Sequence, residues 1–294
     1  GAGGALGGNG TIGGNVTLNG GTLTGVGPLA IGGTLNVVAA SGIAVNTTVA
    51  GLTSVSAGGL GLGSATTFTA NGGIDWSGGN LSGPADASFV VPLGKVLNVT
   101  GVTKEISGAT LQNDGTVNLA LNIGNNLQLS NGGVLTNTGT INFNESTSIA
   151  PRSGFGPGTF NNVGGTLAVA AGKTGSVTVE NANFSGNSTL DTTAAGSLLT
   201  LSPSVAANYS GTLNALGTGV SFANGGATHT FASGSVLNGT FTQSTGNTAF
   251  NNATLNTTYN LQGGALSLAA GTTTLNGTFN YAGGSISGPG GTTL

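Results

Sequence analysis

Short runs of alternating apolar and polar residues, separated by Gly and Asn, recur along this chain and constrain its fold most strongly. Three central segments repeat one pattern at offsets of 24 and 25 residues, namely 111–119, 135–143 and 160–169. In each segment an apolar residue, a polar residue and Asn lead to a Gly, and Thr with alternating apolar residues follows. The pattern predicts a strand, a Gly-centred turn and a second strand.

Strands this short do not form stable hairpins alone, whereas stacked coils bury their inward residues in one continuous core. We therefore expect an all-β fold, a parallel β-solenoid or β-helix, with degenerate coils of roughly 20–25 residues and roughly 12–14 coils. Val, Leu, Ile and Phe should point inward, Thr, Asn and Ser outward, and Gly should occupy corners that need positive φ. An antiparallel arrangement of the strands is the competing architecture, because it also uses short alternating strands.

Composition excludes several other fold classes. The chain has 59 Gly and only 4% charged residues, and Gly, Asn, Thr and Ser are poor helix formers. A hydrophobic share of 37% with a net charge of −3 is unlike a disordered chain. Gly does not recur at every third position, which excludes a collagen triple helix.

A longer repeat links two distant parts of the chain. Residues 71–84 and 276–289 match without a gap at an offset of 205 residues, and Trp76 corresponds to Tyr281. We expect residues 1–294 to form a single continuous solenoid. The chain starts and stops in repeat-like sequence, so we interpret it as a segment of a longer chain or a unit that assembles end to end.

Candidate catalytic residues are scarce. His229 is the only His, there is no Cys, and a catalytic base or metal ligand needs partners. We expect His229 to point outward from a strand. Asp75 and Asp86 are about half a coil apart, Lys104 and Glu105 should point to opposite faces of a strand, and Gly72–Gly73–Ile74–Asp75 is only a fragment of a calcium-binding repeat. We therefore assign no catalytic residue, no cofactor-binding residue and no metal ligand, and expect no enzyme and no cofactor.

The sequence also limits the partners. Its basic residues are too few and too dispersed for nucleic-acid binding: Lys95, Lys104, Arg152 and Lys173. No apolar run is long enough for a membrane helix. Trp76 and Tyr281 are more easily explained by packing than as platforms for sugars, and the Thr-x-Thr pairs are too irregular for an ice-binding face. Several Asn-x-Ser/Thr sequons are candidate glycosylation sites: Asn46, Asn98, Asn187 and Asn238.

Residues 6–23 resemble the Gly/Thr-rich repeats of bacterial autotransporter passenger domains and of giant filamentous-haemagglutinin-like surface proteins. The segments around Trp76 and Tyr281 resemble the same proteins. The resemblance implies a secreted, right-handed β-helix that acts as a stalk, filament or adhesive surface at the cell exterior. It transfers no functional residues, because the matching motifs are structural repeats.

A nearly uncharged surface suits stacking or lateral packing more than an isolated monomer, because charges normally keep monomers soluble. We expect an extracellular structural protein, a filament, stalk or cell-surface fibre, that associates with itself end to end or side by side. The alternative is an autotransporter-like adhesin that binds glycans or host cells. A polysaccharide-active enzyme is a third reading, and it would need carboxylates clustered on one face.

Overall fold

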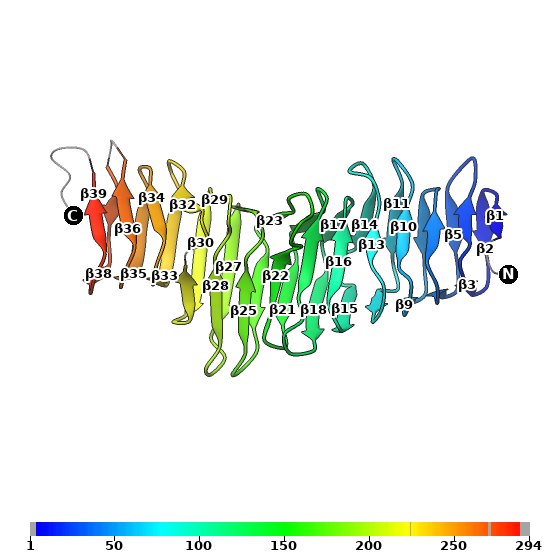
Figure 1. Ribbon diagram of the computed structural model, residues 1–294, viewed down its shortest axis with the longest axis horizontal. Coiled ribbons are helices and arrows are strands. Elements are labelled where there is room, and N and C mark those ends of the chain that lie inside the picture. Colours follow the sequence, from blue (N-terminus) through cyan, green and yellow to red (C-terminus); the bar gives the residue numbers. More distant parts are fainter. Residues whose placement is uncertain (1–3, 224, 270–271, 289–294) are drawn as a thin grey trace. The chain divides into compact units, whose positions relative to one another are not determined.

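The computed structural model describes residues 4–223, 225–269 and 272–288, so Pro289 of the second long repeat lies outside the described residues. All regular elements among them are β-strands, and the strands pair in parallel as a β-solenoid of about 13 turns. The expected fold class is confirmed. The chain divides into two compact units: unit 1 comprises Gly1–Asn142 and Pro151–Gly158, and unit 2 comprises Phe143–Ala150 and Thr159–Leu294. Figure 1 shows the strands within each unit side by side, turn after turn.

Unit 1 has three strands in each turn, and equivalent strands of successive turns pair to build three faces. The first face contains β2 (Gly10–Ile12), β5 (Leu29–Ile31), β8 (Thr47–Val49), β11 (Thr67–Ala70), β14 (Ser88–Val91), β17 (Thr110–Asn113) and β20 (Val134–Asn137). The second face contains β3 (Val16–Leu18), β6 (Leu35–Val37), β9 (Thr53–Val55), β12 (Ile74–Trp76), β15 (Val96–Gly101) and β18 (Thr116–Leu121). The third face contains β1 (Ala5–Gly7), β4 (Thr22–Thr24), β7 (Ser41–Ile43), β10 (Leu60–Leu62), β13 (Leu81–Ser82), β16 (Lys104–Ser107) and β19 (Leu127–Ser130).

Unit 2 repeats this arrangement. Its first face contains β23 (Thr159–Val163), β26 (Asn181–Ser185), β29 (Ala206–Tyr209), β32 (Thr228–Phe231), β34 (Asn247–Phe250), β36 (Ala265–Leu268) and β39 (Ser285–Ser287). The second face contains β24 (Thr166–Val169), β27 (Asn187–Thr192), β30 (Thr212–Gly217) and β37 (Thr274–Leu275), and the third contains β25 (Thr174–Val177), β28 (Leu198–Leu201), β31 (Val220–Phe222) and β38 (Thr278–Tyr281). The longer strands β33 (Val236–Gln243) and β35 (Thr254–Leu261) run along both of these faces. Residues of both units occur in or next to β21 (Thr140–Phe143) and β22 (Thr147–Pro151).

The predicted alternation decides which side chains form the core. Along β18 the apolar residues Val117, Leu119 and Leu121 are buried, and the residues between them are partly exposed. Paired strands keep inward residues in register, as Leu111 with Leu135 shows at the predicted offset. The spacing between paired residues ranges from 17, for Ala5 with Thr22, to 28, for Thr147 with Gly175. The coils are therefore more variable than expected, because the corner loops differ in length.

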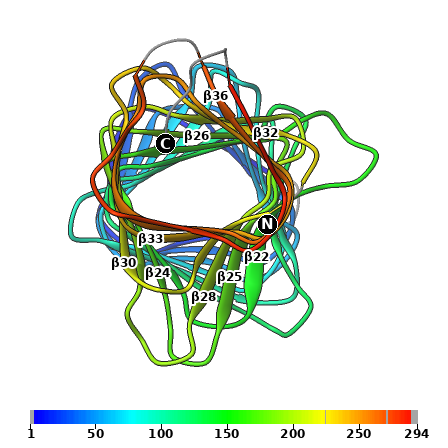
Figure 2. The ribbon, with the colours of Figure 1, turned by 90° about the vertical axis from the view of Figure 1, so that its left-hand side faces the viewer.

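Aromatic rings stack from turn to turn behind the first face of unit 2. The ring centroids of Phe184 and Tyr209 are 5.2 Å apart, those of Tyr209 and Phe231 are 4.4 Å apart, and those of Phe231 and Phe250 are 4.9 Å apart. Figure 2 shows β26 and β32 on one side of the interior of this unit and β24, β30 and β33 on the other. The stack thus fills the space between opposing faces with large buried side chains.

One type of corner recurs. In it, a side chain at or near the end of a strand donates a hydrogen bond to the backbone carbonyl three residues later. Trp76 Nε1–H donates to Gly79 O at 2.9 Å, and the Tyr281 hydroxyl donates to Gly284 O at 2.7 Å. Asn162 and Gln243 make the same bond to the Gly that follows them by three residues. The two long repeats therefore share a corner hydrogen bond, but Trp76 ends a second-face strand and Tyr281 ends a third-face strand.

Candidate functional site

His229 lies in the core rather than at the outward position that we expected. It is fully buried on β32, where strand alternation places it on the same side as Phe231. Its Nε2–H donates to Ala223 O at 3.2 Å, and its Nδ1 accepts from the Tyr209 hydroxyl at 2.8 Å. A carbonyl oxygen can only accept, so the neutral ring carries its proton on Nε2. Burial lowers the pKa of His229 to about 4.

The acidic side chains that the sequence singled out lie apart and bind different partners. Asp75 accepts from Asn98 Nδ2 at 2.8 Å, whereas Asp86 accepts from the Ser64 hydroxyl at 2.6 Å, a bond that lowers the pKa of Asp86. Within the described residues, no three His, Asp or Glu side chains come close enough together to hold a metal ion. Asp75 instead starts a row of side-chain amides along the second face.

That row is one of several amide ladders in which each turn donates to the turn before it. Asn98 donates to Asp75, Asn118 donates to Asn98 at 2.9 Å, and Asn142 donates to Asn118 at 2.9 Å. A longer ladder in unit 2 runs through Asn187, Asn214, Asn238, Asn256 and Asn276. The amides of the sequon residues Asn98, Asn187 and Asn238 are thus engaged in ladders, and Asn46 accepts from the backbone N–H of Thr67.

The densest group of charged side chains surrounds Glu105, a buried residue of β16. Its carboxylate accepts from Asn80 Nδ2 at 2.9 Å and from the Ser130 hydroxyl at 2.5 Å, and it pairs with Arg152 Nη1 at 2.5 Å. Lys104, next to it, points the other way: it is paired in register with the core residue Leu127. The Lys104 ammonium donates to the Val102 carbonyl, and burial lowers its pKa. The expected opposite orientation of the two residues is confirmed.

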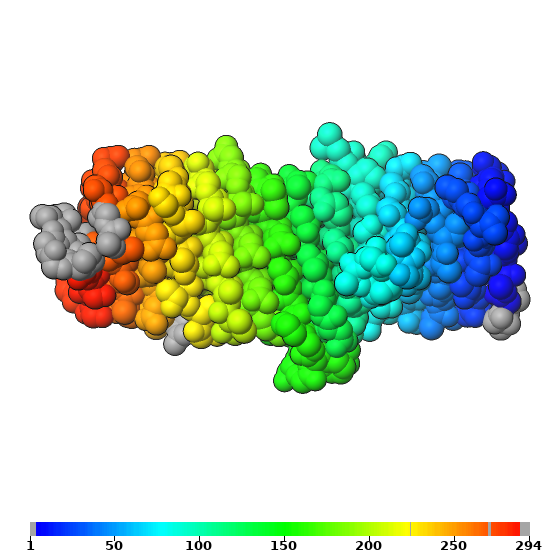
Figure 3. All heavy atoms as spheres, turned by 90° about the horizontal axis from the view of Figure 1, so that it is seen from above, coloured from blue at the N-terminus to red at the C-terminus, as the bar shows by residue number. Residues whose placement is uncertain are grey.

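Arg152 fixes a loop that we call the Phe155 loop, residues 151–158. The backbone N–H groups of Asn131 and Gly132 donate to the carbonyls of Gly156 and Pro157 at 2.8 and 2.9 Å. The guanidinium carbon of Arg152 lies 3.8 Å from the centre of the Phe155 ring. A green segment at this point of the chain extends beyond the neighbouring turns of its unit (Figures 2 and 3).

Phe155 is the most distinctive exposed side chain of this loop, with 46% of its surface accessible. The described aromatic residues of unit 1 otherwise lie in the core. The strand alternation of the sequence does not predict that Arg152 and Phe155 form a pair. The available signal was the run Arg152–Ser–Gly–Phe–Gly–Pro157, which interrupts the strand alternation with turn residues.

The two aromatic residues of the long repeats differ in their surroundings. Trp76 is fully buried, as expected for a packing role, whereas Tyr281 is 58% exposed. Trp76 has paired strands on both sides, β9 and β15, and β38 of Tyr281 has the paired strand β35. Burial of the shared aromatic position therefore depends on the neighbouring turns and not on the motif.

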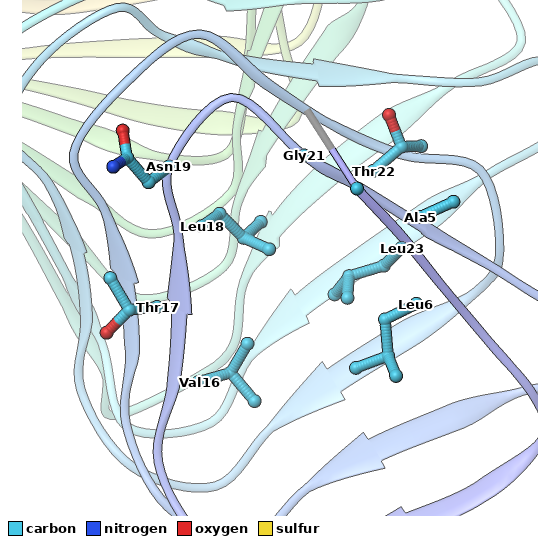
Figure 4. A pocket seen from close by; sticks show the side chains of 10 residues that line it. Ala5, Leu6, Val16, Thr17, Leu18, Asn19, Gly21, Thr22 and Leu23 are labelled. Carbon is cyan, nitrogen blue, oxygen red and sulfur yellow. The ribbon is translucent and has the colours of Figure 1, made fainter. Parts of the chain in front are cut away.

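A hollow of about 230 Å³ lies among the first described turns of unit 1 (Figure 4). Its apolar wall is formed by the buried side chains of Val16, Leu18 and Leu23 and by Leu6, which is 51% exposed. No charged side chain lines it. The hollow is part of the solenoid core and offers no group for acid–base chemistry.

Comparisons with family models, with curated proteins and with solved structures return no match for this chain. Among the described residues, no helix is long and apolar enough to cross a membrane.

Proposed function

We propose that this chain is a structural protein: an extracellular β-solenoid that forms a filament, a stalk or a cell-surface fibre. The observation that carries the proposal is that polar side chains of the surface bind one another from turn to turn, while corner side chains bind the backbone of their own turn. Ladders such as Asp75–Asn98–Asn118 and corner bonds such as Trp76–Gly79 hold the fold together. The proposal gives the chain no catalytic activity, no cofactor and no nucleic-acid partner.

The geometry supports a mechanical role through the direction of its hydrogen bonds. In a parallel solenoid, backbone and amide hydrogen bonds run between turns, and each turn contacts only its neighbours. The core rows, for example Leu97–Val117 and Leu111–Leu135, add apolar contacts between the same turns. A pulling force that separates successive turns is therefore resisted by a backbone ladder, an amide ladder and a packed core together.

Self-association belongs to the proposal, end to end or side by side. Strand edges at the ends of a solenoid can pair with further strands. The surface has few charges that would oppose close contact, since the whole chain has only 11 charged side chains, four basic and seven acidic. The extracellular setting is supported by the resemblance of residues 6–23 to secreted repeat proteins.

Pulling on single molecules tests the mechanical role. The chain contains no Cys, so a cysteine handle added at each end attaches it in an optical trap. We expect resistance followed by lengthening in steps of about 70 Å, the contour of one turn of ~20 residues at ~3.5 Å each. Extension like that of an unfolded chain, without resisted steps, would overturn the proposal.

Adhesion to glycans or host cells is the second candidate function, and the Phe155 loop favours it. Loops inserted into solenoids often form the binding face, and Arg and aromatic residues dominate binding hot spots. Phe155→Ala should abolish binding to a glycan array or to cells. Val26→Ala is the matched control, because Val26 is 97% exposed in the same unit. Equal binding by both variants and the parent chain would exclude the loop as the adhesive site.

A further inference from the structure

The first face of unit 2 presents a regular array of short, uncharged side chains. One row, in register across all seven strands, is Asn161, Asn183, Asn208, Thr230, Ala249, Ser267 and Ser287. The other outward positions of these strands are also uncharged, and all but Val163 are small polar residues or Ala: Thr159, Val163, Asn181, Ser185, Ala206, Thr228, Asn247, Ala265 and Ser285. We call these outward residues the uncharged face.

The charged side chains of unit 2 lie elsewhere in the described structure. Glu145 and Lys173 form an ion pair at 2.6 Å ahead of β22 and β25. Asp191 belongs to β27 on the second face and accepts from Thr193. Glu180 directly precedes β26 and so lies at the rim of the uncharged face. A partner that covers this face does not have to remove a charge from water at its centre, which is the costliest step in burial of a polar surface.

The amides of three neighbouring strands on the face are already bound to one another. Asn183 Nδ2 donates to Asn161 Oδ1 at 2.9 Å, and Asn208 Nδ2 donates to Asn183 Oδ1 at 3.0 Å. Burial of these amides leaves each with a partner, so their desolvation is inexpensive. The ring stack of Phe184, Tyr209 and Phe231 supports the strands from behind. These strands of the face are therefore preorganised, and little conformational entropy is lost when they are covered.

We propose that the uncharged face is the surface through which two copies of this chain associate side by side. A second copy fits because its rows repeat with the same strand spacing of ~4.8 Å, so short side chains of two faces can interdigitate along their whole length. The absence of charge on the face also removes the repulsion that two identical charged faces would feel. This inference rests on the proposed structural function and names the partner surface for lateral assembly.

The area of the face sets the strength of the contact. Seven strands with about four residues each cover roughly 400 Å², about half of the ~800 Å² per partner in a stable interface. A single pair of faces should thus bind weakly. Contacts repeated along an assembled fibre add up through effective concentration, so side-by-side association should become strong only between fibres.

Single cysteines test the inference, because the chain has none of its own. Ala249→Cys places a thiol on β34, the fifth of the seven strands of the face, and Thr258→Cys places one on β35, at a similarly exposed outward position of another face. With a short bis-maleimide at high protein concentration, Ala249→Cys should form cross-linked dimers at least about fivefold faster. Equal rates, or a faster Thr258→Cys, would overturn the inference.

Lysine substitutions at the same two positions provide a second readout in assembled material. Ala249→Lys should reduce light scattering by bundles, because two facing ammonium groups repel each other, and Thr258→Lys should leave it unchanged. Both substitutions are at partly exposed sites, and circular dichroism confirms folding. If pulling shows resisted steps but the two cysteine variants cross-link at equal rates, the uncharged face is not the association surface and the mechanical function stands. Unresisted extension would overturn the function itself.

Discussion

The Tyr209 hydroxyl lies 2.8 Å from Nδ1 of His229, and both side chains are buried behind the first face of unit 2. The His229 ring must remain neutral to accept this hydrogen bond while Nε2–H binds the Ala223 carbonyl. No acidic side chain forms a hydrogen bond or an ion pair with it among the described residues. Tyr209 is the titratable group that faces it, and burial raises the pKa of Tyr209 well above its usual range.

Acid should therefore destabilise unit 2 through His229. The pKa of His229 is about 4 when folded and about 6.5 when unfolded, so the unfolded chain binds more protons between these values. The free energy of unfolding should fall by about 3 kcal/mol as the pH drops from 6.5 to 4, and the His229 contribution should be constant above about pH 7.5. Urea unfolding at several pH values measures this.

His229→Gln is the control for that titration, because Gln keeps a donor and an acceptor but does not ionise. Its stability should depend less on pH between 6.5 and 4 than that of the parent chain. Identical pH profiles for the two proteins would show that His229 does not cause the acid sensitivity.

Gly79 should not tolerate a side chain, since its φ is +67° and a Cβ would overlap the backbone nitrogen of Gly59. We expect Gly79→Ala to cost about 2–5 kcal/mol through strain and overlap. Gly94 has a similar φ of +74° but open space around it, so Gly94→Ala should cost about 1–2 kcal/mol. Thermal unfolding compares the two variants, and equal losses would show that close packing of neighbouring turns is not what constrains Gly79.

Removal of Arg152 and removal of Glu105 should lower the stability by different amounts. Arg152→Met leaves a buried carboxylate without its counter-ion, whereas Glu105→Gln leaves an Arg152 side chain that is 38% exposed and can reach water. We expect Arg152→Met to cost about 3 kcal/mol and Glu105→Gln clearly less. Limited proteolysis of the Phe155 loop together with urea unfolding measures both effects. A larger loss for Glu105→Gln would contradict this account of the loop anchor.

The two long repeats allow a matched test of the corner hydrogen bond. Trp76→Phe removes the donor to Gly79 O in a fully buried site and should cost about 2–4 kcal/mol from the orphaned carbonyl and the lost volume. Tyr281→Phe removes the equivalent donor at an exposed site, where water replaces it, and should cost less than about 1 kcal/mol. Differential scanning calorimetry of both variants checks this, and similar losses would refute the dependence on burial.

Much of the fold could be predicted from the sequence because strand alternation is local information. The segment 111–119 indicates β17, a turn at Asp114 and Gly115, and β18 at the correct positions. The same rule predicts an inward His229, because His229 and Phe231 have the same parity on β32. Treating His as a polar surface residue gave the wrong prediction, although alternation carried the correct signal.

Contacts between turns could not be predicted from the sequence outside the aligned repeats. Glu105 and Arg152 are 47 residues apart, and their pairing depends on how variable corner loops set the register of successive turns. The different exposure of Trp76 and Tyr281, which share a motif, also depends on the neighbouring turns. Asp75 and Asp86 could be judged by their spacing alone, and the structure places them with different partners, as that spacing suggested.

Electron microscopy of the native material, with diffraction along the long axis of any assemblies, tests the structural function most directly. We predict long, uniform fibres with an axial repeat of ~4.8 Å, the separation of paired strands in successive turns. Discrete short particles that do not assemble under any condition would contradict the fibre and shift attention to binding at the Phe155 loop.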